Sequence, residues 1–160
     1  MSSVQIVNAD LDNPIHASGI IGLIKQYASE PGGGGQGLPA ETEAHLIERL
    51  KIQPHRLVLL ALIGDAPIGV AVCFRGFSTF AAQPLINIHD LAVMPEFRGQ
   101  GAGGKLIEAV KSIAIEEGCC KVTLEVYTDN ESARRLYRRY GFSDPQSGNV
   151  QTLSLGAMLP

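Results

Sequence analysis

The chain has 160 residues, of which 45% are hydrophobic and 18% charged, and this length suits a single domain with a substantial core. A net charge of −3 and a pI near 5.8 disfavour a dedicated nucleic-acid binder, which usually carries a basic excess. No apolar run reaches the roughly 18 residues of a membrane span, and Met1 to Leu11 lacks the basic and apolar regions of a secretory signal. We therefore expect one globular domain over residues 1–160 that binds neither nucleic acid nor membranes.

The cysteines and histidines suggest no covalent or metal framework. Three cysteines, Cys73, Cys119 and Cys120, form no even set, and sequence neighbours rarely bridge each other. They predict free thiols with a structural role in a reducing, cytoplasmic setting. The remote histidines, His16, His45 and His55, have no metal-ligand spacing, so we expect no metal site.

The first third of the chain predicts one strand and two helices. Residues 4–7 alternate as a short strand, and Asn13 followed by Pro14 begins a helix over about residues 13–28. The glycine tract at residues 32–37 predicts a flexible linker. A second helix is expected over residues 39–51, before Pro54.

Residues 56–63 and 68–74 are rich in β-branched and aliphatic side chains, and the turn-forming sequence Gly64 to Pro67 separates them, so they predict an antiparallel hairpin. The next strand, over residues 86–93, shows a slip in its alternation. Ile86 and Ile88 share one parity, whereas Leu91 and Val93 share the other. One extra residue between Ile88 and Leu91, a β-bulge, places all four on one face, although a strand buried on both faces also tolerates the pattern.

A glycine-rich loop links this strand to an amphipathic helix that ends near Gly118. The loop glycines are Gly99, Gly101, Gly103 and Gly104. Glycines at a strand-to-helix junction let backbone N–H groups approach a ligand, and the helix N-terminus adds partial positive charge. This stretch therefore predicts an anion cradle for a phosphate group. Residues 121–127 alternate as a second strand, parallel to the first because a helix connects them.

The end of the chain predicts one further helix and two strands. Thr128 to Asn130 caps a helix whose apolar positions repeat at helical spacing. These positions are Ala133, Leu136, Tyr137 and Tyr140. Gly141 ends the helix, Phe142 begins a short strand, residues 144–149 turn, and residues 150–158 form a final strand.

Two familiar phosphate motifs fit the glycine loop incompletely. Gly99-x-Gly101-x-x-Gly104 matches the dinucleotide pattern, and Glu125 lies roughly where a ribose-binding acid is sought. However, five residues separate these glycines from their strand, and the chain has no repeated strand-helix-strand array.

The second motif is the nucleoside-triphosphate loop, which Gly99, Gly104 and Lys105 nearly complete. Leu106 stands where a serine or threonine must hold magnesium. This mismatch argues against nucleotide hydrolysis.

A third pattern, Arg98-Gly-Gln-Gly-Ala-Gly103, resembles the pyrophosphate loop of the GNAT superfamily of acyl-coenzyme A dependent N-acetyltransferases. The run from Asp90 to Gly103 is similar to the central strand and loop of that family. The run Asn130-x-x-Ala133-x-x-x-Tyr137-x-x-x-Gly141-Phe142 is similar to its second motif. The resemblance implies an α/β (α+β) fold: a mixed sheet of about seven strands with about four helices and splayed central parallel strands.

The resemblance also implies where acetyl-CoA binds. The backbones of Leu91, Ala92 and Val93 would pair with the pantetheine arm, and the Leu91 amide or a neighbour would polarise the thioester carbonyl. N–H groups of the loop would hold the pyrophosphate, the residues being Arg98, Gly99, Gln100, Gly101, Ala102, Gly103, Gly104 and Lys105. Asn130 would contact the cofactor or cap its helix, and both roles stay open. Arg98 and Arg138 are the arginines expected nearest the phosphates, although a solvated face explains most arginines of the last helix.

For catalysis, the resemblance makes Tyr137 the general acid that protonates the departing thiolate, with a core tyrosine as the alternative. Glu125, Asp90 and His89 are the candidate general bases, beside the alternative that no protein group serves as base.

The function that follows is direct transfer of an acetyl group from acetyl-CoA to a primary amine in a ternary complex. The alternative is a catalytically inactive acyl-CoA sensor or regulatory module. A small-molecule or peptide amine is the expected acceptor, and a homodimer is compatible with the resemblance.

Overall fold

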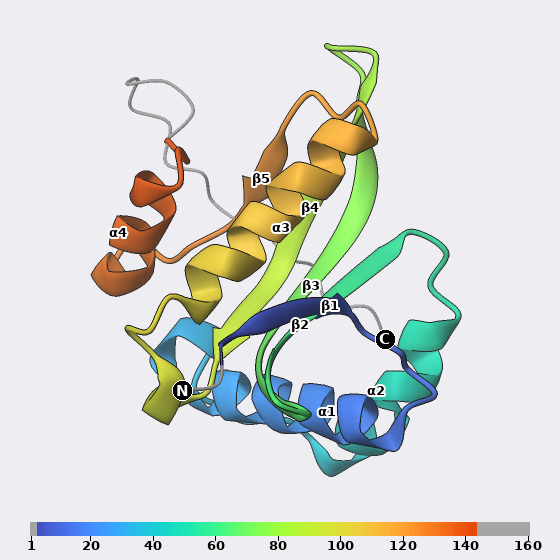
Figure 1. The fold of residues 1–160 in the computed structure, drawn as a ribbon, viewed down its shortest axis with the longest axis vertical. Helices are drawn as coiled ribbons and strands as arrows, with labels where there is room; N and C mark the ends of the chain where they lie inside the picture. The colour runs from blue at the N-terminus through green and yellow to red at the C-terminus, as the bar shows by residue number, and fades with distance from the viewer. Residues whose placement is uncertain (1–2, 144–160) are drawn as a thin grey trace.

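The computed structural model describes residues 3–143, which form a mixed β-sheet covered by helices on both faces (Figure 1). The strands are β1 (Gln5–Asn8), β2 (Arg56–Ile63), β3 (Ala66–Ser78), β4 (Gln83–Val93) and β5 (Val122–Leu124). The helices are α1 (Pro14–Ser29), α2 (Ala40–Lys51), α3 (Ala102–Glu116) and α4 (Glu131–Arg139), with short 3₁₀ turns η1 (Pro31–Gly33) and η2 (Pro95–Phe97).

The sheet follows the order of the chain from β1 to β5. The first four strands pair antiparallel, and β4 and β5 pair parallel, because α3 carries the chain back across the sheet between them. The predicted α/β class, mixed sheet and four helices are confirmed. The predicted count of about seven strands is not shown, since residues 3–143 contain five and Phe142 and Ser143 lie outside any strand. The turn at 144–149 and the strand at 150–158 fall outside the described residues.

The continuous apolar sequence of β2 is explained by burial on both faces. Leu57, Leu59 and Ala61 pack in the cluster under α3, whereas Val58 and Leu60 belong to the cluster under α1 and α2. Figure 1 shows α3 across one face of the sheet and α1 with α2 across the other. Two hydrophobic cores therefore sandwich the sheet, and both stabilise the strand that leads to the glycine loop.

The first helix begins as predicted, because the Asn13 side chain accepts a hydrogen bond from the Ile15 N–H at 2.9 Å. The glycine tract that follows differs from the predicted free linker. The Glu30 carbonyl accepts from the N–H of Gly33 at 3.0 Å, and the Ala28 carbonyl accepts from that of Gly37 at 3.0 Å. The tract therefore folds back on the end of α1 as a hydrogen-bonded turn, which its composition alone does not reveal.

The predicted β-bulge is present in β4. Val72 of β3 pairs with Asp90, and its neighbour Cys73 pairs with Ile88, so His89 is the extra residue. As a result Ile86, Ile88, Leu91 and Val93 all pack in the cluster beneath α3. The parity slip in the sequence was thus a true bulge.

The strand predicted over residues 121–127 is shorter than expected. β5 pairs with β4 only from Ile86–Val122 to Ile88–Leu124, whereas β4 continues to Val93. Pairing stops at the bulge, because a bulge bends its strand and increases the local twist. β4 and β5 therefore share no ladder beyond Ile88, and the splay of the parallel strands stays a prediction.

We predict that two glycines in α1 respond oppositely to substitution by alanine. A Cβ at Gly19 would lie 2.5 Å from Cγ of Pro67, whereas a Cβ at Gly22 would meet nothing within 4 Å. Gly19→Ala should destabilise the fold by about 1–3 kcal/mol through overpacking. Gly22→Ala should stabilise it by about 0.5–1 kcal/mol, because alanine restricts the unfolded chain. Urea unfolding measures both, and equal effects would contradict the close packing of α1 on β3.

Candidate active site

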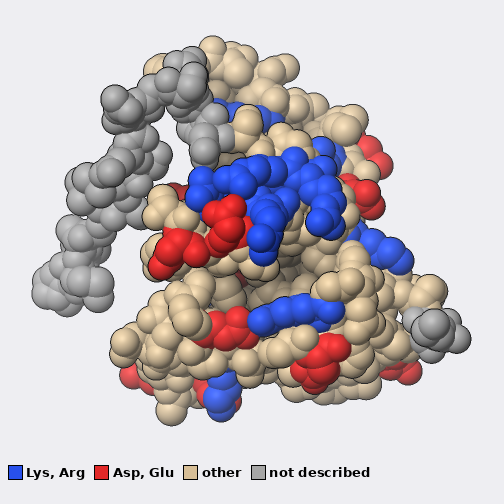
Figure 2. Space-filling model, turned by 90° about the vertical axis from the view of Figure 1, so that its left-hand side faces the viewer, with Lys and Arg blue, Asp and Glu red and all other residues tan. Residues whose placement is uncertain are grey.

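A cavity of about 450 Å³ lies between the end of β4, the glycine loop and α4, and the end of α1 adds Tyr27 and Glu30 to its wall. Figure 2 shows the side of the molecule on which this cavity lies; the surface is hollowed there, and basic side chains lie above and below the hollow. The predicted residues that line the cavity are Leu91, Ala92, Val93, Arg98, Gly99, Gly101, Ala102, Gly103, Gly104, Asn130 and Tyr137. The fold thus brings together two motifs that lie far apart in sequence.

The glycine loop has a conformation that requires glycine at two positions. Gly99 has a φ of 74° and Gly101 a φ of 88°, in the left-handed region that favours glycine. Gly101 is also the N-cap of α3, and no side chain caps that end. Because the first N–H groups of a helix have no partner within it, the start of α3 offers donors and partial positive charge to the cavity. This arrangement suits an anion.

Arg98 is held by two protein groups at the edge of the cavity. Its Nε donates to the Val93 carbonyl at 2.8 Å, and its terminal nitrogen lies 2.6 Å from a Glu30 carboxylate oxygen. Burial works to raise the pKa of Glu30, but hydrogen bonds from Arg98 and Gln26 outweigh it and leave that pKa below its ordinary value. Glu30 therefore stays ionised and paired.

The arginines of α4 divide into two kinds. Arg134 and Arg138 lie 3.4 and 3.2 Å from the carboxylate of Glu131, whereas Arg135 and Arg139 line the cavity. The expectation that Arg138 lies nearest the phosphates is not supported by this placement. Glu131 lies three residues before Arg134 and four before Arg135, so spacing along the helix alone does not separate the two kinds.

Two side chains of α4 pack closely against the first turn of α3. A Cβ at Gly104 would overlap the ring of Tyr140, and a Cβ at Gly103 would lie 3.4 Å from Leu136. Asn130 caps α4, since its side-chain oxygen accepts from the Ala133 N–H at 3.2 Å, and it also lines the cavity. The capping role is therefore present, and it leaves the Asn130 amide beside the cavity.

Three tyrosines line the cavity: Tyr27, Tyr137 and Tyr140. Burial, with a smaller effect of Tyr27, raises the pKa of Tyr137 to about 12, so its hydroxyl stays protonated near neutral pH. The Tyr27 hydroxyl donates to the Gly32 carbonyl at 3.0 Å. Tyr27 carries no functional signal in the sequence, because its helical spacing with Leu23 and Ile24 is that of a core residue.

Five predicted residues do not line the cavity, and three of them are the candidate bases: Glu125, Asp90 and His89. Glu125 is exposed beyond the end of β5. The His89 ring packs edge-on against Phe74, with centroids 5.7 Å apart. Asp90 is partly buried, and burial raises its pKa against the opposing effect of His89. Burial raises the pKa of Tyr27, and the Asp90 charge adds a smaller effect in the same direction.

The other two residues outside the cavity are Lys105 and Gln100. The Lys105 ammonium donates to the Val4 carbonyl at 3.2 Å, and its backbone N–H donates to Gly101. Gln100 donates to the Glu96 carbonyl at 3.2 Å. Neither side chain is directed to the cavity, because each satisfies a backbone carbonyl elsewhere.

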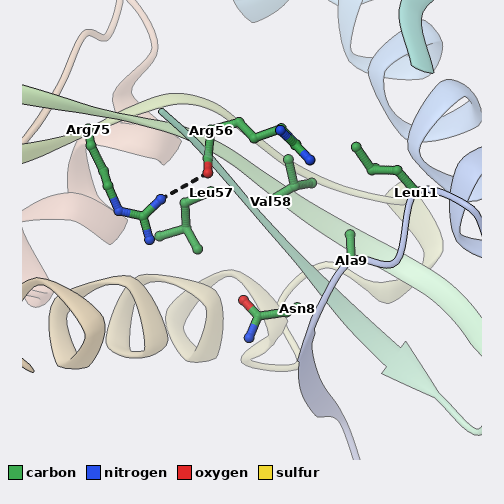
Figure 3. A pocket seen from close by; sticks show the side chains of 7 residues that line it. All are labelled: Asn8, Ala9, Leu11, Arg56, Leu57, Val58 and Arg75. Carbon is green, nitrogen blue, oxygen red and sulfur yellow. Dashed lines mark hydrogen bonds between the residues drawn. The ribbon is translucent and has the colours of Figure 1, made fainter. Parts of the chain in front are cut away.

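A second hollow, of about 320 Å³, lies where β1 leaves the sheet beside β2 and β3 (Figure 3). Arg75 there binds the Glu117 carboxylate through two hydrogen bonds of 2.8 and 2.6 Å and donates to the Arg56 carbonyl at 2.9 Å. The Arg75 charge is already neutralised by Glu117, so the cavity beside the glycine loop is the better candidate site.

Residues 3–143 contain neither a metal-binding cluster nor a membrane-spanning helix. Within them no group of three or more His, Cys, Asp or Glu side chains has the arrangement of a metal site. None of the helices in this part of the chain has the length and apolar character needed to cross a bilayer.

A sequence model described as the Acetyltransferase (GNAT) family matches residues 24–142. The chain therefore belongs to the GNAT family of acetyltransferases, as its two motifs indicated. Members of this family bind acetyl-CoA or CoA.

Two relatives and one solved structure illustrate the kinship. The thialysine N-epsilon-acetyltransferase of Bos taurus is 35% identical over 81 residues, 51% of this chain and 47% of that protein. An uncharacterized N-acetyltransferase of Archaeoglobus fulgidus is 37% identical over 92 residues, 57% of this chain and 63% of that protein. The chain thus spans less than two thirds of either relative. Aminoglycoside N-acetyltransferase AAC(6')-Iy in complex with CoA shares the fold at a TM-score of 0.75 and 20% identity, over 97% of each chain.

We predict that Tyr137 makes stability fall at high pH. The folded chain holds the Tyr137 pKa near 12 against an ordinary 10.0, so it binds this proton more tightly than the unfolded chain does. Its contribution is therefore complete below pH 10 and is lost as pH rises toward 12. The urea midpoint of the wild type should fall more than that of Tyr137→Phe between about pH 9.5 and about pH 11.5. Equal losses would contradict the buried phenol.

Proposed function

We propose that this protein transfers an acetyl group from acetyl-CoA to a primary amine by direct attack in a ternary complex. The observation that carries the proposal is the single cavity that joins the helix-terminal anion cradle to a protonated Tyr137. An anion site alone would serve many ligands. A cradle and a proton donor in one cavity suit a phosphorylated thioester whose thiolate must be protonated on departure.

The charges of the cavity fit coenzyme A. Its wall contains three guanidinium groups, Arg98, Arg135 and Arg139, and one carboxylate, Glu30, that is already paired. The first turn of α3 adds backbone donors through Ala102 and its neighbours. A ligand with several phosphate charges is favoured there, whereas a cationic ligand is not.

Each protein group has a defined task in the proposed reaction. Bound acetyl-CoA supplies an activated acetyl group. The backbone from Leu91 to Val93 lies beyond the end of the β4–β5 ladder. In the proposed reaction this backbone orients the pantetheine arm, and the Leu91 amide donates to the thioester carbonyl oxygen. Tyr137 supplies the proton for the departing sulfur. Asp90 is the best placed of the three candidate bases and would act through water, because it does not line the cavity itself.

The cysteines support direct transfer without an acylated enzyme. Burial raises the pKa of the Cys73 thiol to about 12, and burial also raises that of Cys119. A thiol of raised pKa is a poor nucleophile because little thiolate forms. All three cysteines are free, which supports a reducing, cytoplasmic setting as part of the proposal.

A small-molecule amine is the proposed acceptor. The names of the matched proteins, a thialysine N-epsilon-acetyltransferase and an aminoglycoside N-acetyltransferase, both denote enzymes that act on amino groups of small molecules. A peptide amine stays the second acceptor class. The homodimer and the single domain over residues 1–160 also stay predictions.

Thiol release from acetyl-CoA, measured with a panel of amino acids, polyamines, aminoglycosides and peptides, tests the function. We expect release with at least one amine, and Tyr137→Phe should lower kcat by about a hundredfold with an intact fold, since general acids contribute at least that much. Full turnover by Tyr137→Phe would remove the general acid. Tight acetyl-CoA binding without release for any amine would favour the sensor alternative instead.

The arginines of α4 provide a matched test of the coenzyme site. Arg135→Ala and Arg139→Ala should each raise KM for acetyl-CoA by about tenfold, because each removes a cation from the cavity wall. Arg134→Ala and Arg138→Ala remove equal charges from the same helix, but these two arginines pair with Glu131. These controls should change KM by less than about twofold. Equal effects of all four changes would contradict the assigned site.

A further inference from the structure

The end of α1 contacts both walls of the cavity through a short turn. In Figure 1 this turn lies beside the loop that follows β4. On one side the Glu30 carboxylate binds Arg98 at 2.6 Å, across 68 residues of sequence. On the other side Gly32 lies against the Asn130 amide, since a Cβ at Gly32 would lie 2.9 Å from its nitrogen. The turn therefore connects the glycine loop to the start of α4.

Glu30 is held rigidly within this turn. Its backbone N–H donates to Tyr27 at 3.0 Å, and its carbonyl accepts from Gly33 at 3.0 Å and from Gly35 at 2.9 Å. The Gln26 side chain donates to the same carboxylate oxygen that binds Arg98, at 3.2 Å. Only 25% of the Glu30 side chain is exposed, against 86% for Asp12, which forms an ion pair with Lys51. A fixed, partly buried carboxylate loses little entropy when it binds a guanidinium.

Arg98 transmits this rigidity to the last residue of β4. The guanidinium bends back so that Nε donates to the Val93 carbonyl at 2.8 Å, while the backbone N–H of Arg98 donates to Pro95 at 3.3 Å. Both bonds close the η2 turn between the strand and the glycine loop. The orientation of the Val93 peptide, at the mouth of the cavity, thus depends on where the Arg98 guanidinium is held.

We propose that Glu30 is a positioning residue for acetyl-CoA, which acts through Arg98 to fix the Val93 peptide and the entry to the glycine loop. This inference rests on the proposed function of the cavity. Glu30 does not act as a general base, because its carboxylate is occupied by Arg98 and Gln26. The negative charge of Glu30 would repel the phosphates of the coenzyme. Attraction of the ligand therefore does not explain Glu30 in the cavity wall, whereas the geometry that it maintains does.

Positioning and simple electrostatics predict opposite results for Glu30→Gln. Removal of a negative charge from the wall would by itself strengthen the binding of a polyanion. Loss of a positioning contact weakens it. We expect the Kd of free coenzyme A, measured by calorimetry, and the KM for acetyl-CoA to rise about tenfold, with kcat within about twofold of the wild type. An unchanged or lower Kd would overturn the proposal.

A double-mutant cycle with Arg98→Gln tests whether Glu30 acts through Arg98. In the Arg98→Gln background, Glu30→Gln should no longer weaken coenzyme A binding. The same weakening in both backgrounds would overturn the proposal. Asp12→Asn is the matched control, because it breaks an ion pair of equal length, 2.6 Å to Lys51, at the other end of α1. This control should leave Kd unchanged.

The same calorimetry separates this inference from the function on which it rests. If the wild type binds no coenzyme A, the proposed function fails. If the wild type binds coenzyme A and Glu30→Gln binds it equally well, only the positioning role fails. Thermal unfolding of both proteins shows whether a loss of binding merely reflects a loss of fold.

Discussion

β4 contains one residue more than the stretch of β3 that it pairs with, and His89 is that residue. Before it, β4 pairs with strands on both sides; after it, β4 and β5 share no ladder. From Leu91 to Val93 the backbone of β4 therefore has no ladder with β5, and the Val93 carbonyl accepts from Arg98 instead. The glycine loop and α3 begin where this opening widens, so the anion cradle and the opening form one cavity.

The local charge around the cavity differs from the net charge of the chain. The chain is acidic overall, yet the cavity wall contains three guanidinium groups and one carboxylate. The arginines of α4 are either paired with an acid, as Arg134 and Arg138 are with Glu131, or placed on the cavity wall, as Arg135 and Arg139 are. Net charge alone disfavoured a nucleic-acid binder, but it gave no indication of a local cluster of cations beside the glycine loop.

Periodicity and capping in the sequence predicted the helices, their order and the bulge, because these depend on local backbone preferences and on alternation. The start of α1 at Asn13 and the slip between Ile88 and Leu91 are examples. The predicted length of β5, residues 121–127, was wrong, because a strand needs a partner and β4 pairs with β5 only as far as Ile88. The sequence also did not reveal the turn in the glycine tract. The hydrogen bonds of Arg98 with Glu30 and of Lys105 with Val4 were missed as well, since each joins residues distant in sequence.

Gly104 lies in the first turn of α3 against the Tyr140 ring, with no room for a side chain between them. Tyr140 belongs to the cavity wall, so the spacing of α3 and α4 also determines the width of the opening. The absence of a side chain at Gly104 therefore allows the close approach of Tyr140 to α3 that sets the width of the cavity at this point. Any larger residue at position 104 would push Tyr140 and the end of α4 outward, and it would change the shape of the cavity from a position in the first turn of α3.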